Sequence, residues 1–281
     1  MTEERGEFDT EMLDYIASHE PTIRLSFFLG TLGIVGIWQA FAPKRPPSVS
    51  VLWRWTNNFS VTFFNTLLLR LLFPVLAVGL AAVAADRGWG ILNLIELPIA
   101  LSILIAVILQ DLVIYWQHVI FHRVGFLWRF HKMHHADVDY DISTGARFHP
   151  VEIILSMLLK LGVVLLLGPP VVAVIIFEIL LSSIAMFNHA NAGLPSGIDK
   201  IVRKVIVTPD MHRVHHSVIR SEHNSNFGFN MSWWDYIFGT YQAQPSAGHD
   251  QMTIGLDEYQ KDRKQSIFWM LMLPFRRGET S

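Results

Sequence analysis

Four long apolar stretches constrain the fold of this 281-residue chain more than any other feature of its sequence. A helix needs about 20 apolar residues to cross a hydrocarbon core of about 30 Å. Three stretches are long enough, and they cover residues 22–42, 60–85 and 92–116. A fourth, residues 151–187, is too long for one crossing and is interrupted by Gly-Pro-Pro at 168–170, which a helix cannot continue through. The sequence therefore predicts three membrane spans followed by a helical hairpin.

Composition agrees with a membrane protein and excludes several other classes. Charged residues make up 16% of the chain, against the roughly 25% of an average soluble domain, and the formal net charge is −2. We expect no nucleic-acid partner, because there is no basic field to attract one. The chain has no cysteine, which excludes disulfides, thiolate nucleophiles and cysteine-bound iron–sulfur clusters. Any bound metal must therefore be held by nitrogen or oxygen.

The distribution of positive charge predicts the orientation of the spans. Lysine and arginine are frequent in the connections after the first and third spans, whereas the connections on the other side hold only Arg87. Because cytoplasmic connections carry the excess of positive charge, the charged connections and the region from 188 onward are predicted to be cytoplasmic. We expect an all-α integral membrane helical bundle over residues 22–245, with a cytosolic, histidine-rich helical cap.

Two tails flank this predicted domain. Residues 1–21 are acidic and lack the cationic start and short apolar run of a secretory signal, so we expect a mature N-terminal tail. Residues 246–281 form the predicted C-terminal tail. Within it, residues 266–274 are too short to span and follow a charged run, which favours an interfacial segment that rests on the bilayer.

Histidine is the residue type whose distribution indicates chemistry. Eight of the 13 histidines fall in three clusters, which are His118 and His122, then His131, His134 and His135, then His212, His215 and His216. On a helix, positions i and i+4 lie about 40° apart and positions i and i+3 about 60° apart, so each cluster can direct its imidazoles at one point. Thr208, Pro209 and Asp210 are typical of a helix start and predict a helix through 209–216.

The number of clustered histidines predicts two metal ions, because one ion takes at most six ligands. Imidazole binds iron, copper, zinc and nickel, so the ligand type alone does not identify the metal. The setting narrows the choice, since the clusters lie where apolar spans end and an ion can meet a lipid. Oxidation of an unactivated C–H bond by dioxygen is the chemistry that needs a redox metal there. Isolated histidines such as His19, His223 and His249 are expected to be ordinary polar residues.

Segments beside the clusters carry a resemblance to a known family. They are residues 109–116 (LQDLVIYW), residues 144–152 (TGARFHPVE), and residues 226–230 (NFGFN) with Trp234 and Asp235. Over about residues 60–245 the chain resembles the fatty acid hydroxylase/sterol desaturase superfamily of integral-membrane di-iron oxygenases. The resemblance implies that the eight clustered histidines bind two non-haem iron ions. It also implies that dioxygen and two electrons are consumed to hydroxylate or desaturate a fatty acyl, sterol or related lipid.

Other polar residues are candidates for the same site. Members of this superfamily often have further histidines near the metals, which makes His189 our candidate for a ninth ligand. His149 is a further candidate, with a hydrogen-bonded interfacial role as its alternative. Asp111 lies two helical turns before His118 and is predicted to accept a hydrogen bond from an imidazole. Arg70, Lys160 and Glu178 lie in apolar runs and are expected to form ion pairs between helices.

Two functions from other classes compete with an oxygenase. A membrane zinc hydrolase would use the same imidazole ligands, but the His-Glu-x-x-His motif of the common peptidases does not occur in the sequence. A non-catalytic metal-binding membrane protein would sense or transport the ion. A transport path is expected to place polar groups through the bilayer, whereas the clustered ligands lie near one face.

An oxygenase of this composition needs an external source of electrons. The sequence has no Gly-x-Gly-x-x-Gly fingerprint for a flavin or nicotinamide and no cysteine for an iron–sulfur cluster. We therefore expect a separate donor, either a ferredoxin or a small cytochrome with its reductase. Its predicted docking face is formed by the basic residues of the cap, which are Lys200, Arg203, Lys204, Arg213 and Arg220.

Overall fold

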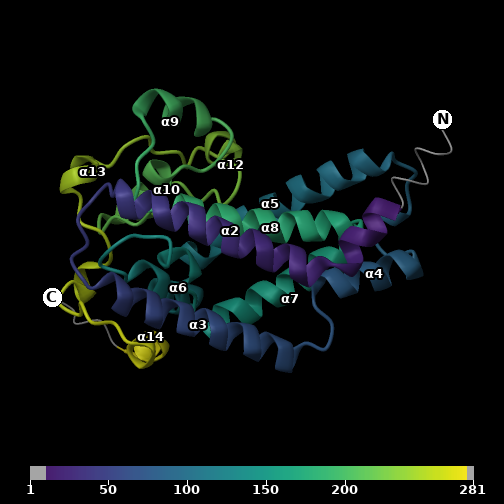
Figure 1. The fold of residues 1–281 in the computed structure, drawn as a ribbon, viewed down its shortest axis with the longest axis horizontal. Coiled ribbons are helices and arrows are strands. Elements are labelled where there is room, and N and C mark those ends of the chain that lie inside the picture. The colour runs from purple at the N-terminus through teal and green to yellow at the C-terminus, as the bar shows by residue number, and fades with distance from the viewer. Residues whose placement is uncertain (1–10, 277–281) are drawn as a thin grey trace.

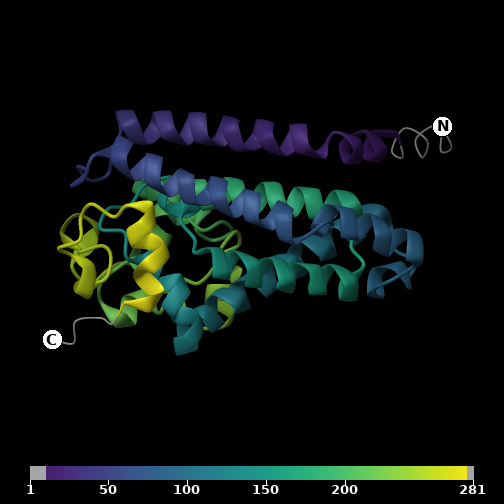
Figure 2. The same cartoon turned by 90° about the horizontal axis from the view of Figure 1, so that it is seen from below.

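The computed structural model describes residues 11–276, and within that range the regular structure is helical, with isolated β-bridges only. The long helices are α2 (Glu20–Phe41), α3 (Val51–Leu72), α5 (Ile99–Arg123), α7 (Pro150–Leu167) and α8 (Val171–Asn188). They extend along the length of the molecule, with α2 on the outside of the bundle (Figures 1 and 2). The predicted all-α helical bundle is confirmed.

The shorter elements form the cap and the turns. Most of them gather at one end of the bundle, whereas α4 lies at the opposite end (Figure 1). They are α4 (Ala77–Arg87), η1 (Ile91–Asn93), α6 (Gly125–His135), η2 (Thr144–Ala146), α9 (Ser196–Val202), α10 (Pro209–His215), α11 (Arg220–His223), α12 (Trp233–Ile237), α13 (Gly248–Gln251), η3 (Asp257–Tyr259), α14 (Ile267–Met272) and η4 (Leu273–Phe275).

Five segments of the described chain are long and apolar enough to cross a membrane, and they include both helices of the predicted hairpin. The hairpin turns at Gly168, where φ is +61° and a side chain would be strained. The predicted helix over 60–85 is wrong in its bounds, because α3 begins at Val51 and ends at Leu72. The helix ends just before Pro74, because proline has no N–H to donate and disfavours helical geometry in the residue before it.

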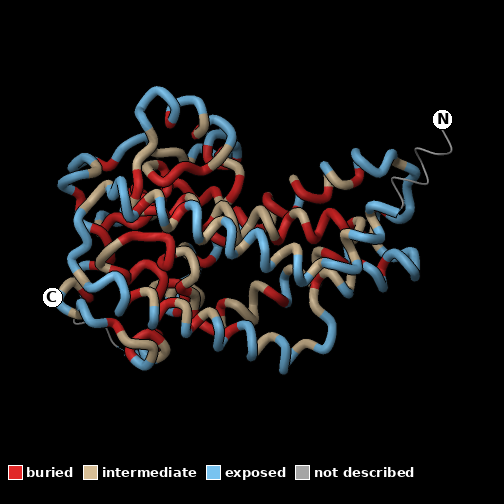
Figure 3. The backbone as a smooth tube through the Cα atoms, viewed as in Figure 1, coloured by how far each residue is buried: buried red, intermediate tan, exposed pale blue. Residues whose placement is uncertain are grey.

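The exposed surface of the long helices is apolar. Figure 3 shows that buried residues concentrate at the capped end of the molecule and become sparse toward the other end. Ile34, Phe63 and Leu166 are 73%, 74% and 73% exposed although they are large apolar residues. Continuous apolar exposure of this kind is stable in lipid and unfavourable in water. The chain is therefore a multi-pass membrane protein.

The direction of each long helix brings the histidine clusters together. Helix α2 ends and α3 begins at the capped end, α5 ends there, α7 begins there and α8 ends there (Figure 1). His118 and His122 lie in the last turns of α5, and α6 follows α5 directly. The cap therefore assembles from segments that all leave the bundle on the same side.

A buried ion-pair network joins the bundle to the cap. Arg54 of α3 donates to both oxygens of Asp137, with Nε–Oδ1 and Nη2–Oδ2 distances of 3.1 and 2.7 Å, and it also pairs with Asp141. Burial favours the neutral form of Asp137, but the guanidinium groups of Arg54 and Arg147 outweigh it and hold the pKa of Asp137 below its ordinary value. The loop that follows α6 is thereby fixed against α3.

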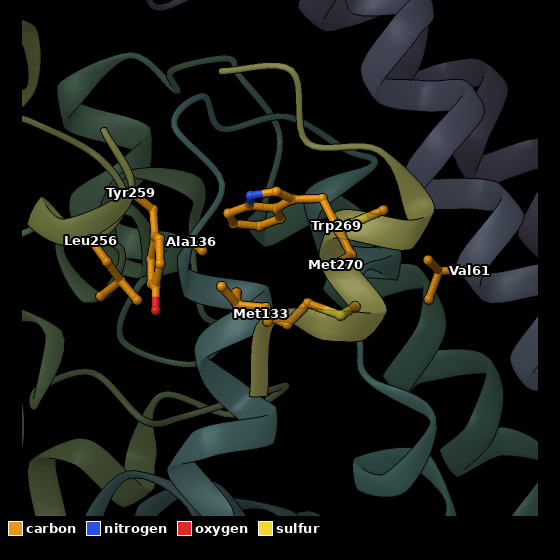
Figure 4. Packing of buried hydrophobic residues seen from close by; sticks show 8 residues of the cluster. Val61, Met133, Ala136, Leu256, Tyr259, Trp269 and Met270 are labelled. Carbon is orange, nitrogen blue, oxygen red and sulfur yellow. The ribbon is translucent and has the colours of Figure 1, made fainter. Parts of the chain in front are cut away.

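The end of the chain is packed beneath the cap. Trp269, Met270 and Leu273 are buried in a cluster with Met133 and Ala136, which belong to α6 and the residue after it (Figure 4). The same segment exposes Phe268 and Phe275 on its other side, which are 78% and 62% exposed. Its interfacial position in the bilayer stays a prediction.

The flanking tails are partly described by the structure. Residues 1–10 of the predicted N-terminal tail lie outside the described residues, and residues 11–18 are helical. The described part of the predicted C-terminal tail contributes Leu256, Tyr259 and the end segment to the cluster of Figure 4. The predicted boundaries at 21/22 and 245/246 remain predictions.

Replacing Arg54 by methionine is expected to destabilise the fold. The Arg54→Met variant leaves Asp137 and Asp141 buried without their main partner, which lowers the free energy of unfolding by about 3–5 kcal/mol. Thermal and denaturant unfolding of the detergent-solubilised chain measures this. Arg87→Met is the matched control, because the Arg87–Asp86 pair is exposed and its loss changes stability by about 0.5 kcal/mol or less.

The same pair of proteins should differ in acid sensitivity. Because the pKa of Asp137 is lowered in the folded state, its contribution to stability is complete above about pH 5, begins to fall near the unfolded value of about 4, and is lost as the pH falls through the lower folded-state value. The stability difference between the wild type and Arg54→Met should therefore narrow as the pH falls from about 5 to about 2. A difference that stays constant over this range contradicts the assignment.

Candidate metal centre

Nine histidines converge in two adjoining groups at the capped end of the bundle. The first group is His118, His122, His131, His135 and His215, and the second is His134, His189, His212 and His216. Within each group the candidate ligand nitrogens all lie within 4.8 Å of one another. All eight clustered histidines are included, and His189 joins them from the end of α8. Each group offers enough nitrogen atoms to hold one metal ion, so the two groups together can hold two ions.

Helical spacing explains how the histidines are divided between the groups. Each i,i+4 pair points at one group, as His131 and His135 do in α6 and as His212 and His216 do at α10. The third histidine of each of these clusters faces the other group, which places His134 in the second and His215 in the first. Thr208 precedes helix α10 and caps it, because its side chain accepts a hydrogen bond from Met211 N at 3.3 Å. The predicted helix start is therefore confirmed.

Hydrogen bonds fix which nitrogen of several rings is available. The Nδ1 atoms of His118 and His215 lie 2.9 and 2.7 Å from the carbonyl oxygens of Phe227 and Ser225. His131 Nδ1 lies 2.7 Å from the carboxylate of Glu152. Since these oxygens act as acceptors, Nδ1 carries the proton and donates, and Nε2 keeps its lone pair for a metal. These partners orient the rings as outer-shell groups do in metal sites.

The unpaired nitrogens fit a metal site. Within residues 11–276, the Nε2 atoms of His118, His131 and His215 are buried without a hydrogen-bond partner. Four further rings have both nitrogens buried without a hydrogen-bond partner, and they are His122, His135, His212 and His216. Buried polar atoms are almost always paired, so such a concentration of exceptions requires an explanation. Metal ligation by imidazole supplies one, and the donor set suits iron, copper, zinc or nickel.

The protonation state of the cap histidines suits metal ligation. Burial, followed by the neighbouring imidazoles, lowers the pKa of His135 and His216 well below the ordinary value of 6.5. The pKa of His212 is lowered in the same way. These rings are therefore neutral at pH 7, which is the form that binds a metal.

A close backbone approach places His189. Gly145 lies against α8, where an added Cβ would be 2.5 Å from the carbonyl oxygen of Ala185 and 3.0 Å from His189 Nδ1. Nδ1 donates to the same Ala185 oxygen at 2.7 Å. The Nε2 atoms of His189 and His134 lie 3.2 Å apart, so the ring is turned toward the second group. His189 is thus brought to the site, as the sequence predicted.

Asp111 has different partners from those predicted. Its carboxylate accepts from the indole Nε1 of Trp234 at 2.8 Å and from Met231 N at 3.2 Å, and not from an imidazole. The ring of His118 is instead held by Phe227, in the loop that also contains Met231. Asp111 therefore anchors the loop that orients His118, and its effect on that ring is indirect.

Two other predicted groups lie outside the two histidine groups. His149 caps α7, with Nδ1 accepting from Val151 N at 3.1 Å, and its Nε2 lies 3.3 Å from the Leu271 carbonyl oxygen. His149 lies outside both groups, and its contacts match the hydrogen-bonded role that was the alternative to metal ligation. In the proposed docking face, Arg203 and Arg213 are buried in ion pairs with Asp199 and Asp210. The exposed basic residues of that face are Lys200, Lys204 and Arg220.

A cavity of about 350 Å³ leads from the first group into the bundle. Its wall includes His118 and His131, together with residues of α2, α3, α5, α7 and α8. Its wall also includes Glu178, which pairs with Lys160 at 3.1 Å and with Arg24 at 3.0 Å, as expected for Glu178 and Lys160. The expected ion pair of Arg70 does not form within residues 11–276. A larger cavity of about 580 Å³ near Arg45 is lined by none of the nine histidines.

Metal stoichiometry should follow this division. The purified chain is expected to bind two transition-metal ions, and the double variant His134→Ala, His189→Ala is expected to bind one, because the first group keeps all five ligands. Elemental analysis against protein concentration measures this. His149→Ala is the matched control and should retain two ions, whereas loss of an ion in that variant contradicts the site as described.

Glu152 is the residue that sequence reasoning missed, because only the fold brings it to His131. Glu152→Ala removes the acceptor of His131 Nδ1, and the loss of such a partner weakens metal affinity by about 10- to 100-fold. Competition with a chelator measures the change. Glu96→Ala, on the loop before α5, is the control and should leave the affinity unchanged.

Comparison with known proteins places the site in a family. Residues 103–240 match the model of the fatty acid hydroxylase family. Relatives include an ornithine lipid hydroxylase of Rhizobium tropici (29% identical over 53% of this chain) and an alkylglycerol monooxygenase of Homo sapiens (31% over 46%). A methylsterol monooxygenase of Arabidopsis thaliana is 26% identical over 57% of the chain.

The matches cover 44%, 28% and 61% of these three relatives, so each is matched over less than two thirds of its length. No solved structure matches the chain significantly. All nine histidines of the two groups lie within residues 103–240. The part of this chain that carries the candidate metal centre is therefore the part that matches the fatty acid hydroxylase family.

Proposed function

We propose that this protein is a membrane-bound di-iron oxygenase that hydroxylates or desaturates a C–H bond of a lipid. The observation that carries the proposal is the cavity of about 350 Å³, whose wall includes both His118 and His131 and the membrane helices. A lipid in the bilayer can thereby reach the metal centre without leaving the apolar layer. The lipid-modifying activities in the names of the three relatives support the same class of substrate.

The residues that would hold two iron ions are the two histidine groups. Bound iron would supply the redox chemistry that activation of dioxygen requires, which zinc does not provide. In a hydroxylation, one oxygen atom of O₂ enters the C–H bond and the other leaves as water, with two electrons and two protons consumed. The protein's own contribution is to orient the imidazoles through Phe227, Ser225 and Glu152, and to hold the lipid in a fixed place.

The electrons would come from a separate donor, a ferredoxin or a small cytochrome with its reductase. The absence of cysteine from the chain supports this, because the chain cannot bind an iron–sulfur cluster through thiolates. We propose that the histidine groups face the cytoplasm, where such donors are found. Lys200, Lys204 and Arg220 are the exposed cations of the predicted docking face, on which an acidic donor can dock.

Comparative lipidomics tests the reaction. Cells that express the wild-type chain are compared with cells that express the double variant His134→Ala, His215→Ala, which removes one ligand from each group. We expect a lipid 16 Da heavier or 2 Da lighter that is present only with the wild type. His149→Ala should retain the product, because His149 caps α7 and lies outside both groups.

The identity of the metal separates this proposal from a hydrolase. The purified protein should contain iron and take up dioxygen when given reductant and lipid. Native zinc, together with activity under anaerobic conditions, would contradict an oxygenase.

A further inference from the structure

The cavity beside the first histidine group contains acceptor oxygens that the chain itself does not use. Asn65 of α3 is 5% exposed and lines this cavity. Its Nδ2 donates to the Phe148 carbonyl oxygen at 2.8 Å, which fixes the orientation of the amide because a carbonyl can only accept. Asn65 Oδ1 is then buried without a hydrogen-bond partner within the described chain.

A comparison along the same helix shows that this is specific to Asn65. Asn57 lies two turns earlier on α3, and both ends of its amide are engaged. Its Nδ2 donates to the Trp53 carbonyl oxygen at 2.8 Å, and its Oδ1 accepts from Ile267 N at 2.9 Å. On α3 the chain therefore pairs both ends of the buried Asn57 amide. At Asn65 it leaves one oxygen for something outside the chain.

Two further acceptors lie at the same end of the cavity. Gln117 precedes the ligand His118 and donates its Nε2 to Ser156, and its Oε1 has no partner among residues 11–276. Glu152 uses Oε1 to orient His131, and its Oε2 is likewise unpaired. All three residues line the cavity. The unpaired groups nearest the metal ligands are thus acceptors that need a donor.

The threonine hydroxyl groups that line the cavity do not supply that donor. Thr62 donates to the Ala146 carbonyl oxygen at 2.7 Å, and Thr66 donates to the Thr62 carbonyl oxygen at 2.9 Å. The rest of the wall is largely apolar and includes Phe121, Phe148 and Phe229. A ligand that fits this cavity is amphiphilic, with an apolar body and a donor group placed beside the histidines.

We propose that Asn65 and Gln117 select lipids that carry a hydroxyl or N–H donor close to the C–H bond that is oxidised. This inference rests on the proposed function, since it assigns the polar end of the cavity to the lipid that the oxygenase would take. A plain hydrocarbon segment in that position would leave the buried oxygens unpaired. Such a mismatch weakens binding by about 5- to 100-fold per group.

The test compares three lipids that share one acyl chain. Monooleoylglycerol offers hydroxyl donors, oleamide offers N–H donors, and methyl oleate offers neither. Each competes with a photoreactive monoacylglycerol for labelling of the full chain in phosphatidylcholine nanodiscs. We expect at least one donor-bearing lipid to inhibit the labelling at a concentration about 5-fold or more below that needed for methyl oleate. Equal competition by all three lipids would overturn the proposal.

Two substitutions at one position isolate the acceptor. Asn65→Leu removes Oδ1 and the bond to Phe148 together, and should abolish the preference for the donor-bearing lipids. Asn65→Asp, with its carboxyl protonated in this apolar setting, keeps a carbonyl acceptor and should retain the preference. Thr66→Val is the control on the same helix, because the Thr66 hydroxyl is used within α3, and it should also retain the preference. A preference that survives in folded Asn65→Leu would overturn the role of Asn65.

Binding and turnover separate this inference from the proposed function. If the preference depends on Asn65 but no lipid is oxidised, the proposed function fails and the inference about binding stands. If methyl oleate is oxidised as fast as the donor-bearing lipids, the oxygenase stands and the inference fails. Metal content, measured on every variant, confirms that the histidine groups are intact.

Discussion

The requirement that buried imidazole nitrogens have a partner governs this structure. Nine rings are packed at one end of a helical bundle, where many of their nitrogens have no partner within the described chain, and burial lowers the pKa of His135, His212 and His216 so that these rings are neutral at pH 7. Their desolvation is unfavourable unless metal ions bind them. The helix directions, the cap and the end of the chain all serve to bring the rings to that place and exclude water from it.

The cap does this through polar contacts that reach across the sequence. Arg54 ties the loop after α6 to the bundle, and Asp111 ties the loop that contains Phe227 to α5. Asp235 accepts from the backbone N–H groups of Phe227 and Gly228, both at 2.8 Å, and so shapes the same loop. The orientation of the His118 ring therefore depends on Asp111 and Asp235, two carboxylates that hold the Phe227 loop and do not touch the ring themselves.

The local sequence was sufficient to predict those parts of the fold that depend on interactions between residues close together in the chain. The presence of five long apolar segments, the break at 168–170, the helix start at Thr208 and the convergence of the clustered histidines could all be predicted, whereas the bounds of the second span could not. Asp111 was assigned to His118 because the two lie on one helix face, whereas its partner Trp234 is 123 residues away. Arg213 was placed on the surface although it is fully buried. Such pairings depend on tertiary contacts that no local pattern contains.

The interleaving of the two histidine groups has a consequence for how the centre assembles. Helix α6 offers His131 and His135 to one group and His134 to the other, and the segment at α10 is divided in the same manner. An ion that occupies one group therefore restrains the two helices that present ligands to its neighbour. The second ion meets rings whose conformational freedom is already reduced, so that loading should be cooperative and reciprocal. Each group can then hold its ion alone, and the affinity of one group rises when the other is occupied.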